Sequence, residues 1–264
     1  MLYKRIASSC VLVGIISATL FVDWVFGLLA TLFIVVGLYE FFTILENKSI
    51  GMFKYFGIGM GIVIPLSITF HFEPTKGWEL LFTILALLVL IVMQFTRRQN
   101  SGAIVDISTT IFAILYISWS ISFLIKIRFL DNGFGLLSSV LLITKLGDIG
   151  AYIVGTGFGK TPLLPRISPK KSVEGAIGGL VFSVLGAFIS MPLVHFNYAH
   201  LLFLGVFLGI LGQLGDLSES LLKRDCQVKD SSSVVPGMGG VLDLVDSLIF
   251  TGPVFYFYIS TVIK

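Results

Sequence analysis

Residues 215–247 read GDLSESLLKRDCQVKDSSSVVPGMGGVLDLVDS, and this charged stretch lies between two apolar segments, LLFLGVFLGILGQL (201–214) and LIFTGPVFYFYISTVI (248–263). Neither apolar segment contains a charged residue. Such segments are typical of helices inside a bilayer, where a charged side chain is costly. The pattern predicts two membrane helices with a polar segment between them at the membrane surface.

The rest of the chain has the same character. It has 264 residues, of which 56% are hydrophobic and 12% charged, and its mean hydropathy is +0.99. These values exclude an ordinary soluble domain. Because a bilayer core of roughly 30 Å needs about 20 apolar residues per helical span, we predict an all-α integral membrane protein, a polytopic bundle of about nine transmembrane helices. They are expected near 6–20, 24–45, 52–70, 79–95, 108–126, 134–156, 174–194, 200–222 and 240–262.

The basic residues predict the orientation of these helices. With the N-terminus in the cytoplasm, thirteen of the 18 Lys and Arg residues fall on the cytoplasmic side, four on the other side, and Lys145 within a span. Positive charge accumulates on the cytoplasmic side of membrane proteins. We therefore expect a multi-pass membrane protein with loops 157–173 and 221–239 facing the cytoplasm and Lys264 outside. The expected location is the bacterial inner membrane.

The two halves of the chain differ in polar content. We expect one membrane domain over 1–264, with apolar helices in 1–133 and the catalytic helices and cytoplasmic loops in 134–264. Glu40 is the main charged residue within an apolar run of the first half. Because it lies near the end of its expected helix, we predict that it reaches toward water.

Three carboxylates lie at the ends of the last two helices. Asp243 and Asp246 are spaced i, i+3, so they share one helix face. Asp216 continues a stripe that contains Gly209 and Gly212, and it should therefore face a closely packed neighbour. A set of hard oxygen ligands suits Mg²⁺. In the alternative reading, Asp243 caps its helix while Asp216 and Asp246 pair with Lys or Arg.

Two basic loops supply donors for phosphate oxygens, because they combine lysine and arginine with serine and glycine. Such loops also attract anionic lipid headgroups without any catalysis. Within the first loop, GTGFGKT (155–161) is one residue short of a P-loop and follows a helix rather than a strand, so we reject that motif. Asp148 lies three residues after Lys145. It either forms an internal ion pair with this lysine or acts as a further ligand for metal or substrate.

These segments resemble the signature of the phosphatidate cytidylyltransferases, the CDP-diacylglycerol synthases. The family pattern runs Ser-x-apolar-Lys-Arg, Lys-Asp, Pro-Gly-His-Gly-Gly and Asp-Arg-x-Asp. The matching residues in this segment are Ser220, Lys223, Arg224, Lys229, Asp230, Pro236, Gly239, Gly240, Asp243 and Asp246. GDIGAY (147–152) and the segment from Gly159 to Gly175 resemble the upstream motifs. The resemblance covers about 145–250, and Met238 and Leu244 depart from it, standing where the family has His and Arg.

The resemblance implies the reaction of CTP with phosphatidate to give CDP-diacylglycerol and pyrophosphate. It implies Mg²⁺ held by Asp216, Asp243 and Asp246, together with a second, monovalent cation, and Asp148 as a further catalytic carboxylate. We expect a homodimer embedded in the lipid bilayer and no nucleic-acid partner. The residues expected to bind the substrates are Ser168, Lys170, Lys171, Ser220, Lys223, Arg224 and Lys229.

Two alternatives belong to other functional classes. A transporter with carboxylates in its pathway would carry charges through the whole membrane, whereas here they gather at the predicted cytoplasmic ends of helices. The other alternative is a different CTP-dependent lipid enzyme, such as a polyprenol kinase.

Overall fold

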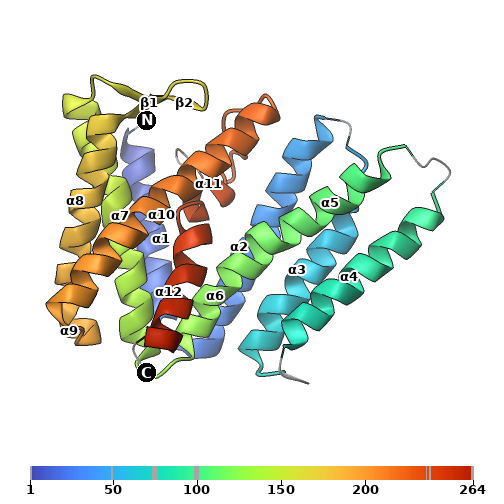
Figure 1. Ribbon diagram of the computed structural model, residues 1–264, viewed down its shortest axis with the longest axis horizontal. Helices are drawn as coiled ribbons and strands as arrows, with labels where there is room; N and C mark the ends of the chain where they lie inside the picture. The colour runs from blue at the N-terminus through green and yellow to red at the C-terminus, as the bar shows by residue number, and fades with distance from the viewer. Residues whose placement is uncertain are drawn as a thin grey trace. The chain divides into compact units, whose positions relative to one another are not determined.

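The computed structural model describes residues 2–48, 50–72, 77–97, 101–235, 237 and 239–262. They form helices and one short β-hairpin (Figure 1). The elements are α1 (Leu2–Thr19), α2 (Asp23–Glu46), α3 (Lys54–Thr69), α4 (Trp78–Phe95), α5 (Ala103–Ala113), the π-helical turn η1 (Ile114–Trp119), α6 (Ser120–Arg128), α7 (Gly133–Phe158), β1 (Pro162–Leu164), β2 (Ser168–Ser172), α8 (Val173–Ile189), α9 (Met191–Val194), α10 (Tyr198–Asp225), α11 (Leu242–Val245) and α12 (Leu248–Val262).

Many of these helices have the length and composition of membrane spans, as the sequence predicts. Within the described part of the chain, six helical stretches are long and apolar enough to cross a bilayer. They are Asp23–Glu46, Trp78–Phe95, Ala103–Arg128, Gly133–Phe158, Tyr198–Asp225 and Leu242–Val262. Three shorter apolar helices are Cys10–Thr19, Lys54–Thr69 and Val173–Ile189. The all-α membrane class is confirmed, and the number of nine spans stays a prediction.

The chain forms two compact units. The first contains Met1–Ile125 and Asp230–Leu242, and the second contains Lys126–Lys229 and Asp243–Lys264. A segment of the polar stretch that opened the sequence analysis therefore belongs with the N-terminal helices. The division into 1–133 and 134–264 within one membrane domain stays a prediction.

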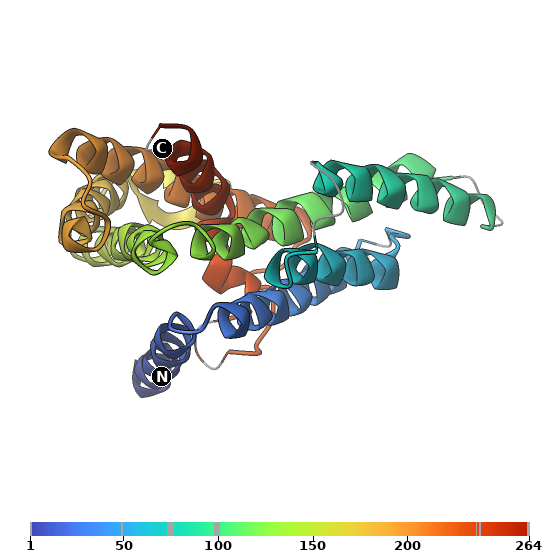
Figure 2. The same ribbon diagram turned by 90° about the horizontal axis from the view of Figure 1, so that it is seen from below.

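The first unit is built around α2, which packs against α3 and η1 (Figure 2). Glycines permit this close packing, because a Cβ at Gly57 would overlap with the Phe42 ring and one at Gly61 would overlap with Leu38. At the same crossing, the Ser118 hydroxyl donates to the Gly61 carbonyl at 2.9 Å. Small residues at helix contacts of this kind are the usual means of close packing inside membranes.

The second unit is built around α7, α8 and α10, with α12 against α10. The glycine stripe on α10 lies on its packed face, as the sequence predicts: a Cβ at Gly205 would overlap with Val184, and one at Gly209 would overlap with Ser183. Asp216 follows these glycines along the same helix.

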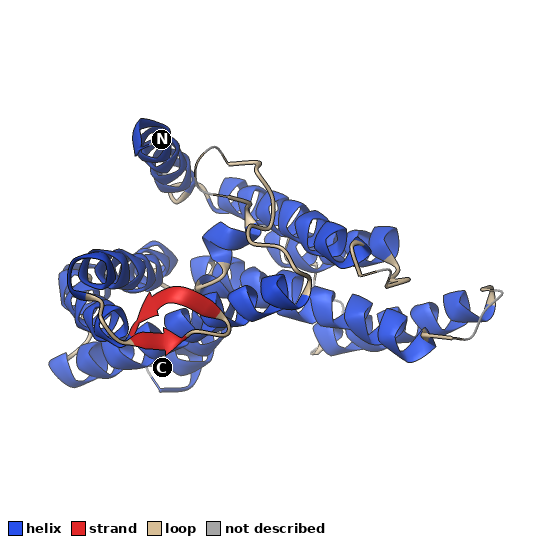
Figure 3. Ribbon diagram, turned by 90° about the horizontal axis from the view of Figure 1, so that it is seen from above, coloured by secondary structure: helices blue, strands red, loops and turns tan. Residues whose placement is uncertain are grey.

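A short antiparallel hairpin, β1–β2, connects α7 to α8 (Figure 3). The Ser172 hydroxyl accepts from the Gly175 amide at 3.1 Å and so caps α8. The Glu174 carboxylate accepts from the backbone amides of Lys160 (3.0 Å) and Thr161 (3.1 Å). These donors satisfy the ionised carboxylate. These hydrogen bonds join the start of the basic segment 157–173 to the first turn of α8 and so fix its backbone there.

Glu40 corrects one sequence-based expectation. We predicted that it reaches toward water, but it is only 2% exposed. Its carboxylate accepts hydrogen bonds from Ser231, Ser232, Val241 and Leu242. The prediction is wrong because donors about 200 residues away in sequence replace water around this carboxylate.

Candidate active site

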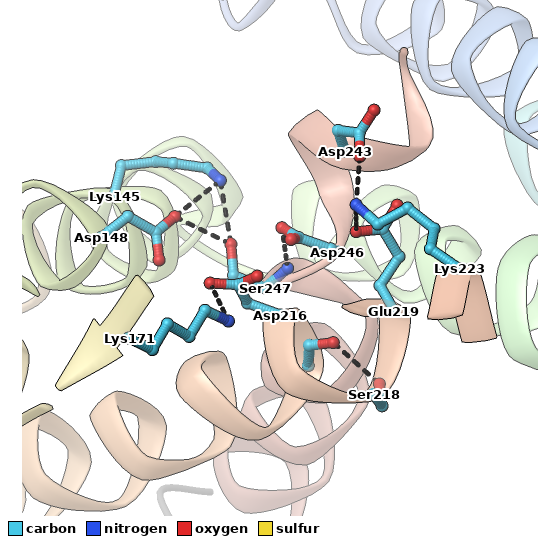
Figure 4. Close-up of polar contacts among 11 residues, drawn as sticks. Lys145, Asp148, Lys171, Asp216, Ser218, Glu219, Lys223, Asp243, Asp246 and Ser247 are labelled. Carbon is cyan, nitrogen blue, oxygen red and sulfur yellow. Dashed lines mark hydrogen bonds and ion pairs between the residues drawn. The ribbon is translucent and has the colours of Figure 1, made fainter. Parts of the chain in front are cut away.

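Charged and hydroxyl side chains of the second unit gather where the ends of several of its elements meet (Figure 4). They come from α7, β2, α10, α11 and the segment just before α12. The residues are Lys145, Asp148, Lys171, Asp216, Ser218, Glu219, Lys223, Asp243, Asp246 and Ser247. Much of the sequence-predicted set therefore lies in one region.

Lys145 connects α7 to the break between α11 and α12. Its Nζ donates to Asp148 Oδ2 (3.0 Å), Ser247 Oγ (2.9 Å) and the Leu244 carbonyl (3.0 Å). The Ser247 hydroxyl also donates to Asp148 Oδ2 at 3.0 Å. The internal ion pair considered for Asp148 is therefore present. Its side chain remains 37% exposed, so the carboxylate is also accessible to a ligand.

Asp216 forms an ion pair with Lys171 of β2 at 2.6 Å. Asp246 is 7% exposed, accepts from the Ser247 amide at 2.6 Å, and interacts electrostatically with Asp216, Asp148 and Lys145. Gly215 permits this arrangement, because a Cβ there would overlap with the Asp246 carbonyl. Glycine lets α10 pass close to the α11–α12 break, which brings the Asp216 and Asp246 carboxylates near each other.

Lys223 forms a second ionic group with two carboxylates. Its Nζ contacts Glu219 Oε2 at 2.6 Å and also contacts Asp243 Oδ1. The Glu219 side chain is only 1% exposed. The sequence reasoning did not select Glu219, although its i, i+4 spacing from Lys223 on α10 is the spacing of a helical ion pair. Ser247 was also missed, and its only sequence signal is its place next to Asp246.

Other predicted binding residues lie around this region. Arg224 donates to the backbone carbonyls of Ile167 (Nε, 3.3 Å) and Val228 (Nη1, 3.4 Å), and so connects the end of α10 to the segment between β1 and β2. Lys170 and Lys229 are exposed, and Ser168 and Ser220 are half-buried.

Of the two residues that depart from the family pattern, the structure describes only one. Leu244 is half-buried, and its carbonyl accepts from Lys145. Met238 lies outside the described residues.

The oxygen donors of this region match the chemistry that Mg²⁺ prefers, because they are carboxylates with neither His nor Cys among the residues named above. In the described part of the chain, however, no three His, Cys, Asp or Glu side chains are grouped so that they could hold a metal ion. Asp216 and Asp243 instead each contact a lysine. The metal triad therefore stays a prediction.

Comparison with known proteins gives a consistent result. Residues 3–262 match the model of the cytidylyltransferase family. A phosphatidate cytidylyltransferase of Synechocystis is 32% identical over 289 residues, covering 97% of this chain and 96% of the relative. Those of Bacillus subtilis and Staphylococcus saprophyticus are 32% and 35% identical, covering 85% and 82% of this chain and 85% of each relative. The chain therefore belongs to the cytidylyltransferase family.

Proposed function

We propose that this member of the cytidylyltransferase family transfers the cytidylyl group of CTP to phosphatidate, giving CDP-diacylglycerol and pyrophosphate. The three similar proteins named above carry the name of this activity. The observation that carries the proposal is the grouping of lysines and aspartates from α7, β2, α10 and the α11–α12 break, with the pair of Asp216 and Lys171 next to Asp246.

The reaction requires two anionic substrates to approach each other. A phosphate oxygen of phosphatidate forms a bond to the α-phosphorus of CTP, the bond from that phosphorus to the β-phosphate oxygen breaks, and pyrophosphate leaves. A phosphate monoester is already ionised at neutral pH, so this nucleophile needs no strong general base. Lys171 and Lys223 offset the charge of the two substrates, and Arg224 suits bidentate contact with a phosphate. Positioning and charge neutralisation are the main contributions that such a site makes.

We assign Asp216, Asp243 and Asp246 as the residues that hold Mg²⁺, with Asp148 as a further carboxylate and a second, monovalent cation nearby. Bound Mg²⁺ supplies positive charge that stabilises the pentacoordinate transition state. The carboxylate oxygens of this set support the assignment.

The site is proposed to face the cytoplasm of a bacterial inner membrane. CTP then enters from water, while the acyl chains of phosphatidate stay in the bilayer beside the apolar helices. A homodimer and the absence of a nucleic-acid partner are parts of the same proposal.

The test uses purified protein in detergent with α-³²P-labelled CTP and phosphatidate, with and without EDTA. We expect labelled CDP-diacylglycerol, release of pyrophosphate, and loss of both on chelation. Release of CDP with a polyprenol acceptor, and no product from phosphatidate, would instead indicate a lipid kinase.

The carboxylates are tested one by one. Asp216→Asn, Asp243→Asn and Asp246→Asn should each lower kcat by about two orders of magnitude or more, because each removes a charged ligand from the transition-state region. Asp225→Asn is the matched control, since Asp225 is an exposed residue on the same helix as Asp216, and it should retain wild-type turnover. Full activity in a folded Asp243→Asn protein would contradict the assignment.

A further inference from the structure

Glu40 is a buried carboxylate that the proposed chemistry does not use. It lies in α2, which is a candidate membrane span. A buried carboxylate is strongly unfavourable unless donors satisfy it. The hydrogen-bond donors around Glu40 therefore indicate its role.

Among the described residues, four donors to Glu40 lie between 231 and 242, and they are arranged evenly on the two oxygens. Oε1 accepts from the Ser232 hydroxyl (2.5 Å) and the Val241 amide (3.0 Å). Oε2 accepts from the Ser231 hydroxyl (3.3 Å) and the Leu242 amide (2.8 Å). Each oxygen thus receives one hydroxyl and one backbone N–H, so the ionised carboxylate matches this donor set on both sides.

The segment is shaped to receive this carboxylate. A Cβ at Gly240 would overlap with both the Ser231 hydroxyl and the Glu40 carboxylate. Val235 and Gly239 form a tight antiparallel bridge, and the φ angles of Gly237 (80°) and Gly239 (103°) lie in the left-handed region that favours glycine. The glycines of this segment therefore let its backbone approach the Glu40 carboxylate closely.

Both ends of the segment adjoin residues of the candidate active site. Ser231 follows Lys229 by two residues, and Leu242 immediately precedes Asp243. The hydrogen bond from the Leu242 amide to Glu40 fixes the backbone one residue before Asp243, whose carboxylate contacts Lys223. Resting on the function proposed above, we propose that Glu40 is a positioning residue: it holds the described residues 231–232 and 241–242, and through the adjoining backbone it orients Asp243 for the cytidylyl-transfer reaction.

Glu40→Gln tests this role sharply. An amide NH₂ in place of either oxygen would face a backbone N–H, so one of the two amides loses its acceptor and meets a donor. Glu40→Asp keeps the charge and should retain more activity than Gln. The matched control is Glu46→Gln, which makes the same change on the same helix at a side chain that is 50% exposed and pairs with Lys54.

Two readouts separate positioning from a general loss of folded protein. In Glu40→Gln, the Mg²⁺ concentration for half-maximal activity should rise about tenfold, as for loss of residues that orient metal ligands. Trypsin should cleave after Lys229 about tenfold faster, because release of the loop raises local opening. Cleavage after Lys170, in the other basic segment, is the internal reference and should be unchanged. Glu46→Gln should match the wild type in both readouts.

The outcomes are decisive in either direction. A folded Glu40→Gln protein with wild-type Mg²⁺ dependence and wild-type cleavage at Lys229 would overturn the proposal. This holds whether its turnover is normal or lowered. If Glu40→Gln does not fold, Ser232→Ala decides: it removes one donor to Oε1 and should shift both readouts in the same direction by about threefold, as loss of one hydrogen bond predicts, and no shift would refute the role. A wild-type protein that makes no CDP-diacylglycerol would refute the proposed function, while the cleavage comparison would still test whether Glu40 holds the loop.

Discussion

Replacing Lys223 with methionine should destabilise the second unit strongly. Lys223 contacts both Glu219 and Asp243, and the three side chains are only 12%, 1% and 12% exposed, respectively. Methionine keeps most of the apolar stem and removes the charge, so two neighbouring carboxylates remain without their cation. Removing one partner of a buried ion pair costs about 3–5 kcal/mol. We take about 3 kcal/mol, because two of the side chains retain some contact with water.

This loss should lower the midpoint of thermal unfolding by about 6–12 °C for a chain of this size. Cys226 can report unfolding, because it is buried at 6% exposed, whereas Cys10 is exposed. In a Cys10→Ser background, a thiol-reactive fluorophore should react with Cys226 only as the protein opens. The control is Lys170→Met, a change at an exposed lysine, which should alter stability by no more than about 0.5 kcal/mol.

A second substitution identifies the cause. Glu219→Gln added to Lys223→Met removes one of the two carboxylates that lose their contact with Lys223 and should recover a substantial part of the lost stability. Turnover should stay low, since Lys223 is assigned to phosphate binding. A Lys223→Met protein that unfolds within about 2 °C of the wild type would refute the reasoning, because it would mean that this ionic group contributes no more than a surface salt bridge.

Three further predictions concern the surroundings of the site. Lys145→Met should lower kcat by about tenfold to a hundredfold, as for other residues that orient active-site ligands. Adding Leu244→Arg should restore part of the lost kcat, because it returns a cation to the α11–α12 break. Steady-state kinetics of the single and double variants check both results. Met238→His should leave CDP-diacylglycerol synthesis intact or raise it, and complete loss would mean that this position is adapted to methionine. Reporter fusions after Lys229 and at Lys264 should lie on opposite sides of the membrane, and finding both on one side would contradict the nine-span topology.

Local sequence determines much of this protein. Inside a bilayer only helices and closed barrels satisfy their backbone polar groups. Long continuous apolar runs fit helices rather than short alternating strands, so the all-α class follows from the length of these runs. The glycine stripe before Asp216 predicts a packed helix face, and the structure confirms it at Gly205 and Gly209. The i, i+3 spacing of Lys145 and Asp148 likewise indicates an ion pair as one of the two roles considered for Asp148, and the structure contains that contact. Each of these features depends on residues within one or two helical turns.

Only the tertiary structure decides which partner each charged residue meets. Glu40 and Leu242 are joined by a hydrogen bond across 202 positions of sequence, and no local pattern distinguishes a carboxylate that reaches water from one that finds such donors. The same holds for Lys171 and Asp216, which come from a hairpin and a helix. The sequence does not distinguish whether a charge near a helix end is satisfied by water, by a lipid headgroup or by another part of the protein. The choice depends on chain packing, because burial removes the water and leaves only the donors that the fold has placed within reach.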